Sequence, residues 1–157
     1  MTSEDILTVL REQYHSRGNN DQWAYFEELR IGTGYGRGVE QRLDAWVMHL
    51  WPSHSMVRIA YEVKTSRADF LTELKSPIKR RKALLYSNLF FFVTPPGLVR
   101  PEEIPIECGL EEVREVRDHQ RLEIVVPAPW RDNPPPPWSL FAAVARRVAR
   151  EERKVTT

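Results

Sequence analysis

The pattern of apolar and polar residues along the chain predicts a helix near each end. Between residues 6 and 14, apolar side chains recur at three- and four-residue intervals, the spacing of one helical face. The same spacing returns between residues 140 and 148 and predicts a last helix over residues 138–153. The segments between these two helices follow a different periodicity.

Residues 43–50 and 56–64 read as two β-strands joined by a short connection. In the second segment the odd-numbered residues from 57 to 63 are apolar, whereas Arg58, Glu62 and Lys64 fall on the other face. This alternation predicts an antiparallel hairpin whose second strand buries one face.

Other signals complete the order of elements. Residues 23–31 fit either a helix or a strand, and a Ser66/Asp69 capping-box pattern starts a helix. Pro77, preceded by Ser76 as a cap, ends that helix and begins another over residues 78–86. An apolar run at residues 89–94 suits a strand buried on both faces, and residues 111–116 and 122–126 suit a hairpin. The order predicts an α/β or α+β arrangement of layers around a mixed sheet.

Composition narrows the class of protein. The 157 residues fit one domain, and 23 basic against 22 acidic residues exclude a strongly basic nucleic-acid coat but not a local basic patch. A single cysteine, Cys108, allows no intrachain disulfide. No apolar run is long enough to span a membrane and the first residues lack a secretory signal, so we expect a cytoplasmic protein without a membrane partner.

The prolines divide the chain. Six of the twelve fall between residues 127 and 137, where an extended polyproline segment is expected. We therefore predict a domain over residues 1–126, a linker over residues 127–137, and a helix over residues 138–157 that packs on the domain or on a partner.

The predicted hairpin brings three candidate catalytic residues close together. A register in which Leu50 faces Met56 places Asp44 directly opposite Glu62, and Lys64 projects from the same face as Glu62. Two adjacent carboxylates need a compensating charge, which a divalent cation such as Mg²⁺ supplies, and a metal at this point can activate water for attack on a phosphodiester. Glu62 and Lys64 on a solvated strand edge, with Asp44 as a lone surface acid, form the alternative reading.

The residues around these three resemble the PD-(D/E)XK nuclease superfamily, and in particular its MmcB-like branch of DNA repair proteins. The similarity lies in RLDAWV (residues 42–47), YEVKTSRADF (61–70) and LFFFVTPPG (89–97). It implies a restriction-endonuclease-like core, with a central mixed sheet flanked by helices, and metal-dependent hydrolysis of DNA in repair or processing.

The resemblance also implies roles for individual residues. Asp44 and Glu62 would ligate Mg²⁺ or Mn²⁺, the backbone carbonyl of Val63 would add a ligand, and Lys64 would orient the attacking water. The superfamily often adds an earlier glutamate, for which Glu28 is our choice among several upstream acids.

Cations downstream of the strands are candidates for contacts to nucleic acid. Lys79, Arg80, Arg81 and Lys82 follow one another at the start of a predicted helix, where free N–H groups and positive charge favour phosphate. Arg67 extends this surface, and Arg37, within the glycine-rich segment 32–38, would touch the substrate from a flap. The alternatives are a solvated charged face and a plain flexible loop.

Two further functions stay open at this point. One is a non-catalytic nucleic-acid-binding module on the same fold. The other is a small protein-interaction domain, with the proline-rich segment and the last helix as the surface for a homodimer or another protein partner.

Overall fold

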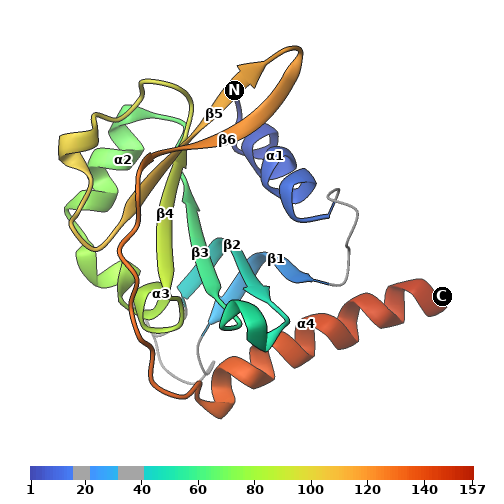
Figure 1. The fold of residues 1–157 in the computed structure, drawn as a ribbon. Helices are drawn as coiled ribbons and strands as arrows, with labels where there is room; N and C mark the ends of the chain where they lie inside the picture. The colour runs from blue at the N-terminus through green and yellow to red at the C-terminus, as the bar shows by residue number, and fades with distance from the viewer. Residues whose placement is uncertain (16–21, 32–40) are drawn as a thin grey trace.

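The computed structural model describes residues 1–15, 22–31 and 41–157 of the chain. Within these residues one mixed sheet holds six strands in the order β1 to β6 (Figure 1). Neighbouring strands are antiparallel from β1 to β3, parallel from β3 to β5, and antiparallel between β5 and β6. The strands are β1 (Trp23–Ile31), β2 (Gln41–His49), β3 (Arg58–Val63), β4 (Leu89–Thr94), β5 (Gly109–Val116) and β6 (His119–Val126).

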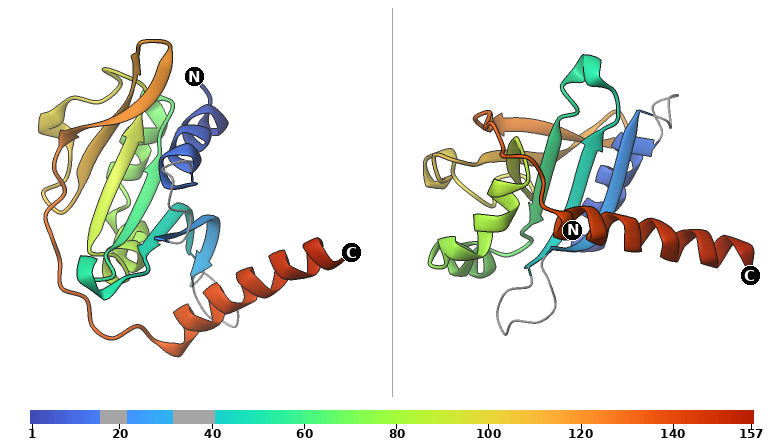
Figure 2. Two further views of the ribbon diagram at one scale, coloured as in Figure 1. Left: turned by 45° about the vertical axis from the view of Figure 1, so that its right-hand side comes forward. Right: turned by 90° about the horizontal axis from the view of Figure 1, so that it is seen from below.

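Helices cover both faces of this sheet. Helix α1 lies on one face, and α2 and α3, which connect the parallel strands β3 and β4, lie on the other (Figures 1 and 2). The predicted α/β class is therefore confirmed: the chain forms a single mixed-sheet domain flanked by helices, followed by a C-terminal helix. The helices are α1 (Ser3–His15), α2 (Arg67–Leu74), α3 (Arg81–Leu85) and α4 (Trp138–Thr156).

Strand β4 lies at the centre of two apolar cores. Its Phe90 and Phe92 pack with Phe70 of α2, whereas Phe91 and Val93 pack on the α1 side. Burial on both faces explains why residues 89–94 read as an unbroken apolar run, and it confirms the predicted strand.

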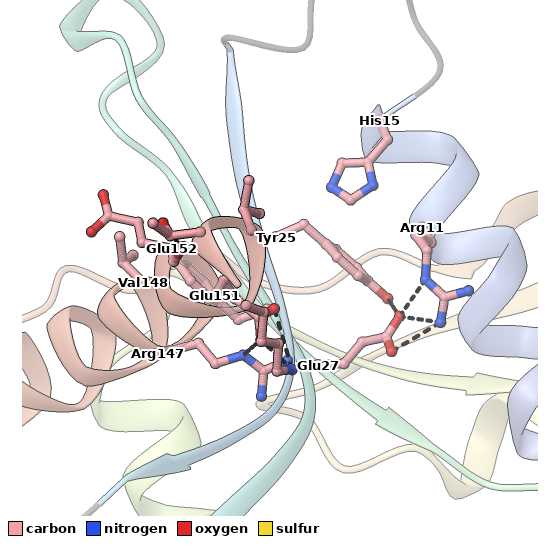
Figure 3. Close-up of a pocket in the computed structure, with 12 residues that line it drawn as sticks. Arg11, His15, Tyr25, Glu27, Arg147, Val148, Glu151 and Glu152 are labelled. Atoms are coloured by element: carbon pink, nitrogen blue, oxygen red, sulfur yellow. Dashed lines mark hydrogen bonds and ion pairs between the residues drawn. The ribbon is translucent and has the colours of Figure 1, made fainter.

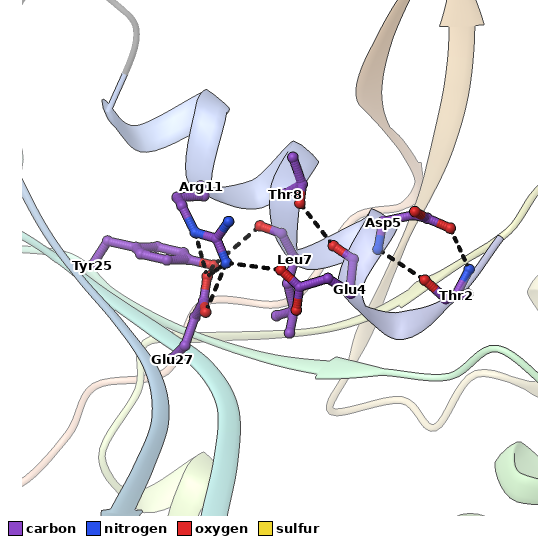
Figure 4. A network of polar contacts seen from close by, with 8 residues as sticks. All are labelled: Thr2, Glu4, Asp5, Leu7, Thr8, Arg11, Tyr25 and Glu27. Atoms are coloured by element: carbon purple, nitrogen blue, oxygen red, sulfur yellow. Dashed lines mark hydrogen bonds and ion pairs between the residues drawn. The ribbon is translucent and has the colours of Figure 1, made fainter.

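A polar network also ties α1 to the sheet (Figure 4). Arg11 donates to both carboxylate oxygens of Glu27 on β1, each at 2.9 Å, and the Tyr25 hydroxyl donates to the same carboxylate at 2.9 Å. The Arg11 guanidinium is thus held between the helix and β1. The Glu27 carboxylate faces α1 and is not offered to the opposite face of the sheet.

The proline-rich segment and the last helix follow the domain. Residues 127–137 contain no helix or strand, as predicted, and α4 then buries Leu140 and Ala143. Farther along, Val148 and Val155 are exposed, and the helix continues beyond the sheet (Figure 2). No helix in the described part of the chain is both long and apolar enough to cross a membrane.

The structure corrects the helix expected over residues 78–86. Pro77–Arg80 forms a 3₁₀ turn, Arg81–Leu85 is a five-residue α-helix, and the Ser76 side chain makes no capping hydrogen bond. The tighter turn directs the Arg80 side chain into the protein, where its Nη1 donates to the backbone carbonyl of Glu73 at 3.1 Å. The segment 23–31, which the sequence left between helix and strand, is the strand β1.

Strand β5 carries a buried carboxylate, Glu111, directly beside Val93. The residue is 5% exposed, and its Oε2 has no hydrogen-bond partner among the described residues. Burial raises the pKa of Glu111 from 4.5 to about 7. Above pH 7 the folded protein therefore carries a buried, uncompensated charge.

We expect this charge to make stability depend on pH. The raised pKa costs the folded state roughly 3 kcal/mol at pH 8, and the cost disappears as the pH falls through 7 to below 4.5. Glu111→Gln removes the charge, so its free energy of unfolding relative to wild type is higher at pH 8 than at pH 5 by roughly this amount. Urea unfolding at the two pH values measures this difference; a difference that does not change with pH contradicts the assignment.

Candidate functional site

The register of β2 and β3 decides where the candidate acids lie. Ala45 pairs with Tyr61, and Trp46 with Ala60, which is the register that the sequence predicts. One step further along both strands, Asp44 lies beside Glu62. The side chains of Tyr61 and Val63 belong to the core under α1, so Glu62 projects from the opposite face of β3.

Asp44 and Glu62 are each held by a hydrogen bond. Asp44 Oδ2 accepts from the backbone N–H of Val63 at 2.8 Å, and Glu62 Oε1 accepts from Lys64 Nζ at 2.8 Å. Burial, followed by the charge of Asp44, raises the pKa of Glu62 to about 7, although Lys64 opposes the shift. Burial also raises the pKa of Asp44, which the Val63 N–H and Lys64 oppose. Both carboxyl groups thus lie where added positive charge is favourable.

Lys64 lies among three carboxylates. Besides Glu62, its Nζ is 3.5 Å from Glu73 Oε2 and 3.6 Å from Asp69 Oδ2, and its side chain is only 7% exposed. Burial lowers the pKa of Lys64, but the surrounding carboxylates outweigh this effect and raise the pKa above its ordinary value. Lys64 is therefore a cation at neutral pH.

Helix α2 brings two of these acids to Lys64. Ser66 caps the helix by accepting from the Asp69 N–H at 3.2 Å, as the sequence predicts. Asp69 and Glu73 are four residues apart and so share one side of the helix. The sequence reading missed Glu73; the spacing of these two acids, directly after a capped start beside Lys64, is the signal that could have identified it.

Glu62 and Lys64 open into a cleft of about 740 Å³. The segment after α2 also lines it, so the cleft combines carboxylates on β3 and α2 with cations from that segment. Its lining is Gln41, Arg42, Glu62, Lys64, Asp69, Glu73, Ile78, Lys79, Arg81 and Lys82. The structure thus brings three of the four predicted consecutive cations to the same cleft as Glu62, whereas Asp44 lies beside Glu62 but is not part of the lining.

Arg80 is the exception and corrects its assignment as a nucleic-acid contact. The residue is 3% exposed, lies 5.8 Å from the centre of the Phe92 ring, and forms ion pairs with Glu73 at 3.8 Å and Glu107 at 3.5 Å. A buried guanidinium with these partners cannot reach a phosphate in solvent. Its role is to neutralise Glu73 from the side opposite Lys64.

Arg67 is also engaged by the protein. Its guanidinium makes two hydrogen bonds to the carboxylate of Glu103, and its side chain is 40% exposed. This pair joins the start of α2 to the segment after β4. Arg67 is absent from the lining of the cleft, so the structure does not place it with Lys79, Arg81 and Lys82. Arg37 lies outside the described residues.

Glu28, the predicted third acid, lies in the same row of the sheet as Asp44, but its side chain is exposed beside Arg42. The pairs Glu27–Ala45 and Leu29–Leu43 place it beside Asp44. Its φ of 51° is left-handed, however, and its side chain is 62% exposed and 3.5 Å from Arg42 Nη1. Glu28 does not line the cleft, and its role as the third acid stays a prediction.

The residues present fit a divalent ion held by few protein ligands. No group of three or more His, Cys, Asp or Glu side chains with metal-site geometry occurs in the described part of the chain. Mg²⁺, however, needs only one or two carboxylates, with water or substrate phosphate in the other positions. The neighbouring carboxylates Asp44 and Glu62, both with raised pKa values, match that requirement. The Val63 backbone carbonyl stays a predicted ligand. The contact that the structure shows for Val63 is its N–H, which donates to Asp44.

A larger hollow, of about 1040 Å³, lies between α1, β1 and α4 (Figure 3). Glu27 in its wall is bound to Arg11, and Glu151 lies 3.4 Å from Arg147. Two of its three acids therefore already have cationic partners, and none of the predicted site residues that the structure describes lines this hollow.

The difference between Arg80 and Lys79 predicts different effects on stability. Arg80→Met leaves the buried Glu73 with one cationic partner fewer, and we expect it to lower the free energy of unfolding by roughly 3 kcal/mol. Lys79→Met, one residue earlier and exposed, changes it by less than about 0.5 kcal/mol. Urea unfolding of both variants measures the contrast. Equal losses contradict the structural role of Arg80.

No protein-family model matches the chain, and no curated protein matches it. Among solved structures, the chain is similar to the SPO1766 protein of unknown function from Silicibacter pomeroyi. The two sequences are 20% identical, and the match has a TM-score of 0.58 and covers 94% of this chain and 86% of the other. This likeness supports the α/β fold and carries no information about the chemistry of the cleft.

Proposed function

We propose that the protein is a Mg²⁺-dependent nuclease that hydrolyses phosphodiester bonds of DNA, in DNA repair or processing. The observation that carries the proposal is that Glu62, beside Asp44 of the neighbouring strand, lines one cleft together with Lys64, Lys79, Arg81 and Lys82. Acids that attract a divalent cation and cations that attract phosphates thus line the same cavity.

Asp44 and Glu62 are the residues that would hold Mg²⁺ or Mn²⁺. When bound, the ion would supply positive charge to the scissile phosphate and lower the pKa of a coordinated water. The Val63 N–H fixes one oxygen of Asp44 at 2.8 Å, so this carboxylate is oriented before a ligand arrives. Glu62 is oriented in the same way by Lys64.

Lys64 acts as a fixed cation. It is protonated at neutral pH, because three carboxylates raise its pKa, and so it cannot take a proton from water. Its Nζ can instead donate a hydrogen bond to the attacking water and favour the hydroxide form through its charge. Glu73 and Asp69 hold the ammonium within 3.6 Å, which limits its movement away from Glu62.

The cations from the segment after α2 would hold the substrate. Exposed Lys79 and Arg81, and partly buried Lys82, have the charge needed to contact phosphates on either side of the scissile bond. Because they come from one short segment after α2, their distance from Lys64 is fixed by the packing of that segment. Binding is thereby coupled to placement at the acids.

The proposal is tested by incubating supercoiled plasmid with purified protein and Mg²⁺. Wild type nicks the plasmid, chelation by EDTA stops it, and Asp44→Asn lowers the rate at least ~100-fold, because several kcal/mol of stabilisation of the reacting phosphate are lost. Asp118→Asn, the same substitution in the exposed β5–β6 turn, is the matched control and keeps full activity. Circular dichroism checks that both variants fold.

Two results would contradict the proposal. Nicking that is equal in wild type and Asp44→Asn places the activity elsewhere or in a contaminant. Absence of nicking by wild type with Mg²⁺ or Mn²⁺, across single- and double-stranded DNA, removes the nuclease proposal.

Substrate binding is tested separately with the double variant Lys79→Gln/Lys82→Gln. Loss of two phosphate contacts should weaken binding of a fluorescent duplex and reduce the slope of log K against log salt by about 1.8. Fluorescence anisotropy at four salt concentrations gives the slope. An unchanged slope shows that DNA does not lie along this segment.

A non-catalytic nucleic-acid-binding module is the second candidate. The direct bond between Lys64 and Glu62 favours it, because in this arrangement the lysine is occupied by its own neighbour. It predicts salt-sensitive DNA binding by wild type that depends on Lys79 and Lys82, with no cleavage under any metal. The two assays above separate the two functions.

A further inference from the structure

A second basic pocket lies between β1 and α4. It has a volume of about 480 Å³, and four arginines and one glutamate line it together with Leu29 and Ala143. The charged residues are Glu28, Arg30, Arg146, Arg147 and Arg150. Such an excess of guanidinium groups around a polar hollow is typical of a site for an anion with several oxygen atoms.

The arginines of α4 fall into two groups. Arg147 lies 3.4 Å from Glu151, which also binds Lys154 at 3.3 Å, on the side that faces the hollow of Figure 3. Arg146, Arg150 and Arg153 recur at four- and three-residue intervals and so form one stripe along the helix. We call these three residues the α4 stripe.

The α4 stripe is exposed and uncompensated. All three side chains are exposed, and no carboxylate in the described part of the chain is within ion-pair distance of any of them. Packing does not require this arrangement, because the helix is anchored through Leu140 and Ala143. Three neighbouring cations repel one another, so an anionic ligand would lower the energy of this surface.

The basic pocket is linked to the candidate cleft by one contact between their lining residues. Glu28, in the pocket, is 3.5 Å from Arg42, which lines the cleft. Glu28 on β1, Asp44 on β2 and Glu62 on β3 also occupy one row across the sheet. Since adjacent strands are about 4.8 Å apart, the pocket begins about 10 Å from Glu62 in this direction.

We propose that the pocket between β1 and α4, together with the α4 stripe, binds the phosphate backbone of the same DNA that enters the cleft. This inference rests on the proposed function. Arg146 and Arg150 contact phosphates at the pocket, and Arg153 extends the track. The last helix then serves as a binding arm of the enzyme.

Dimensions support a nucleic-acid backbone as the ligand. Arg146 and Arg153 are seven residues apart, which corresponds to about 10.5 Å along a helix. One strand of DNA carries a phosphate per roughly 3.4 Å of its axis, so the stripe spans about three phosphates. A single small anion would use the pocket but leave Arg153 without a role.

The test compares two double variants that remove the same charge. Arg146→Gln/Arg150→Gln changes the pocket, and Arg117→Asn/Arg121→Gln changes the β5–β6 hairpin, where asparagine tolerates the φ of 50° at position 117. Anisotropy with a fluorescent 20-base-pair duplex should show roughly tenfold weaker binding for the first variant and a salt slope lower by about 1.8. The second variant should match wild type. In the plasmid assay, the first variant should raise KM with kcat unchanged, because these arginines do not touch the reacting phosphate.

The outcomes separate this inference from the proposed function. If both double variants lose affinity equally, net charge rather than the pocket is responsible, and the inference is wrong. If neither variant loses affinity while Asp44→Asn still abolishes cleavage, the nuclease proposal is supported and the proposal that α4 binds DNA is wrong. If wild type binds vesicles of phosphatidylserine but no DNA, both proposals are overturned.

Discussion

The candidate site depends on the antiparallel pairing of β2 with β3. Because Ala45 faces Tyr61, Asp44 comes to lie beside Glu62, and a slip of one residue would send Asp44 to the opposite face of the sheet. The buried side chains of Tyr61 and Val63 prevent that slip, since they would then exchange places with charged residues. The apolar core under α1 thus fixes the distance between two carboxylates on the other face.

Charge compensation decides what the remaining polar residues do. Lys64 and Arg80 lie on either side of Glu73 and neutralise acids inside the protein, while Lys79, Arg81 and Lys82 line the cleft. The formal net charge of +1 is therefore a sum over unlike regions. Acids gather where a cation is needed, and unpaired cations gather at the cleft and along α4.

Sequence patterns predicted what local periodicity determines. Alternation in β3 and the length of the connection after β2 were enough to place Asp44 beside Glu62, and the Ser66 cap predicted α2. The direction of Arg80 depends on a 3₁₀ turn and on a partner, Glu107, far along the chain. The direction of the Glu28 side chain depends on a left-handed φ in the middle of β1, a segment whose pattern fits either a helix or a strand. Local sequence patterns do not predict such tertiary contacts and backbone irregularities.

The central claim is that Asp44 and Glu62 share one divalent cation, and locating that cation tests it most directly. Fe²⁺ substituted for Mg²⁺, with ascorbate and peroxide, generates hydroxyl radicals that cut the backbone beside the bound ion. Mass spectrometry of wild type should show cuts near residues 44 and 62–64, which excess Mg²⁺ suppresses and which Asp44→Asn abolishes. Cuts confined to other positions, or unchanged in Asp44→Asn, would contradict the account.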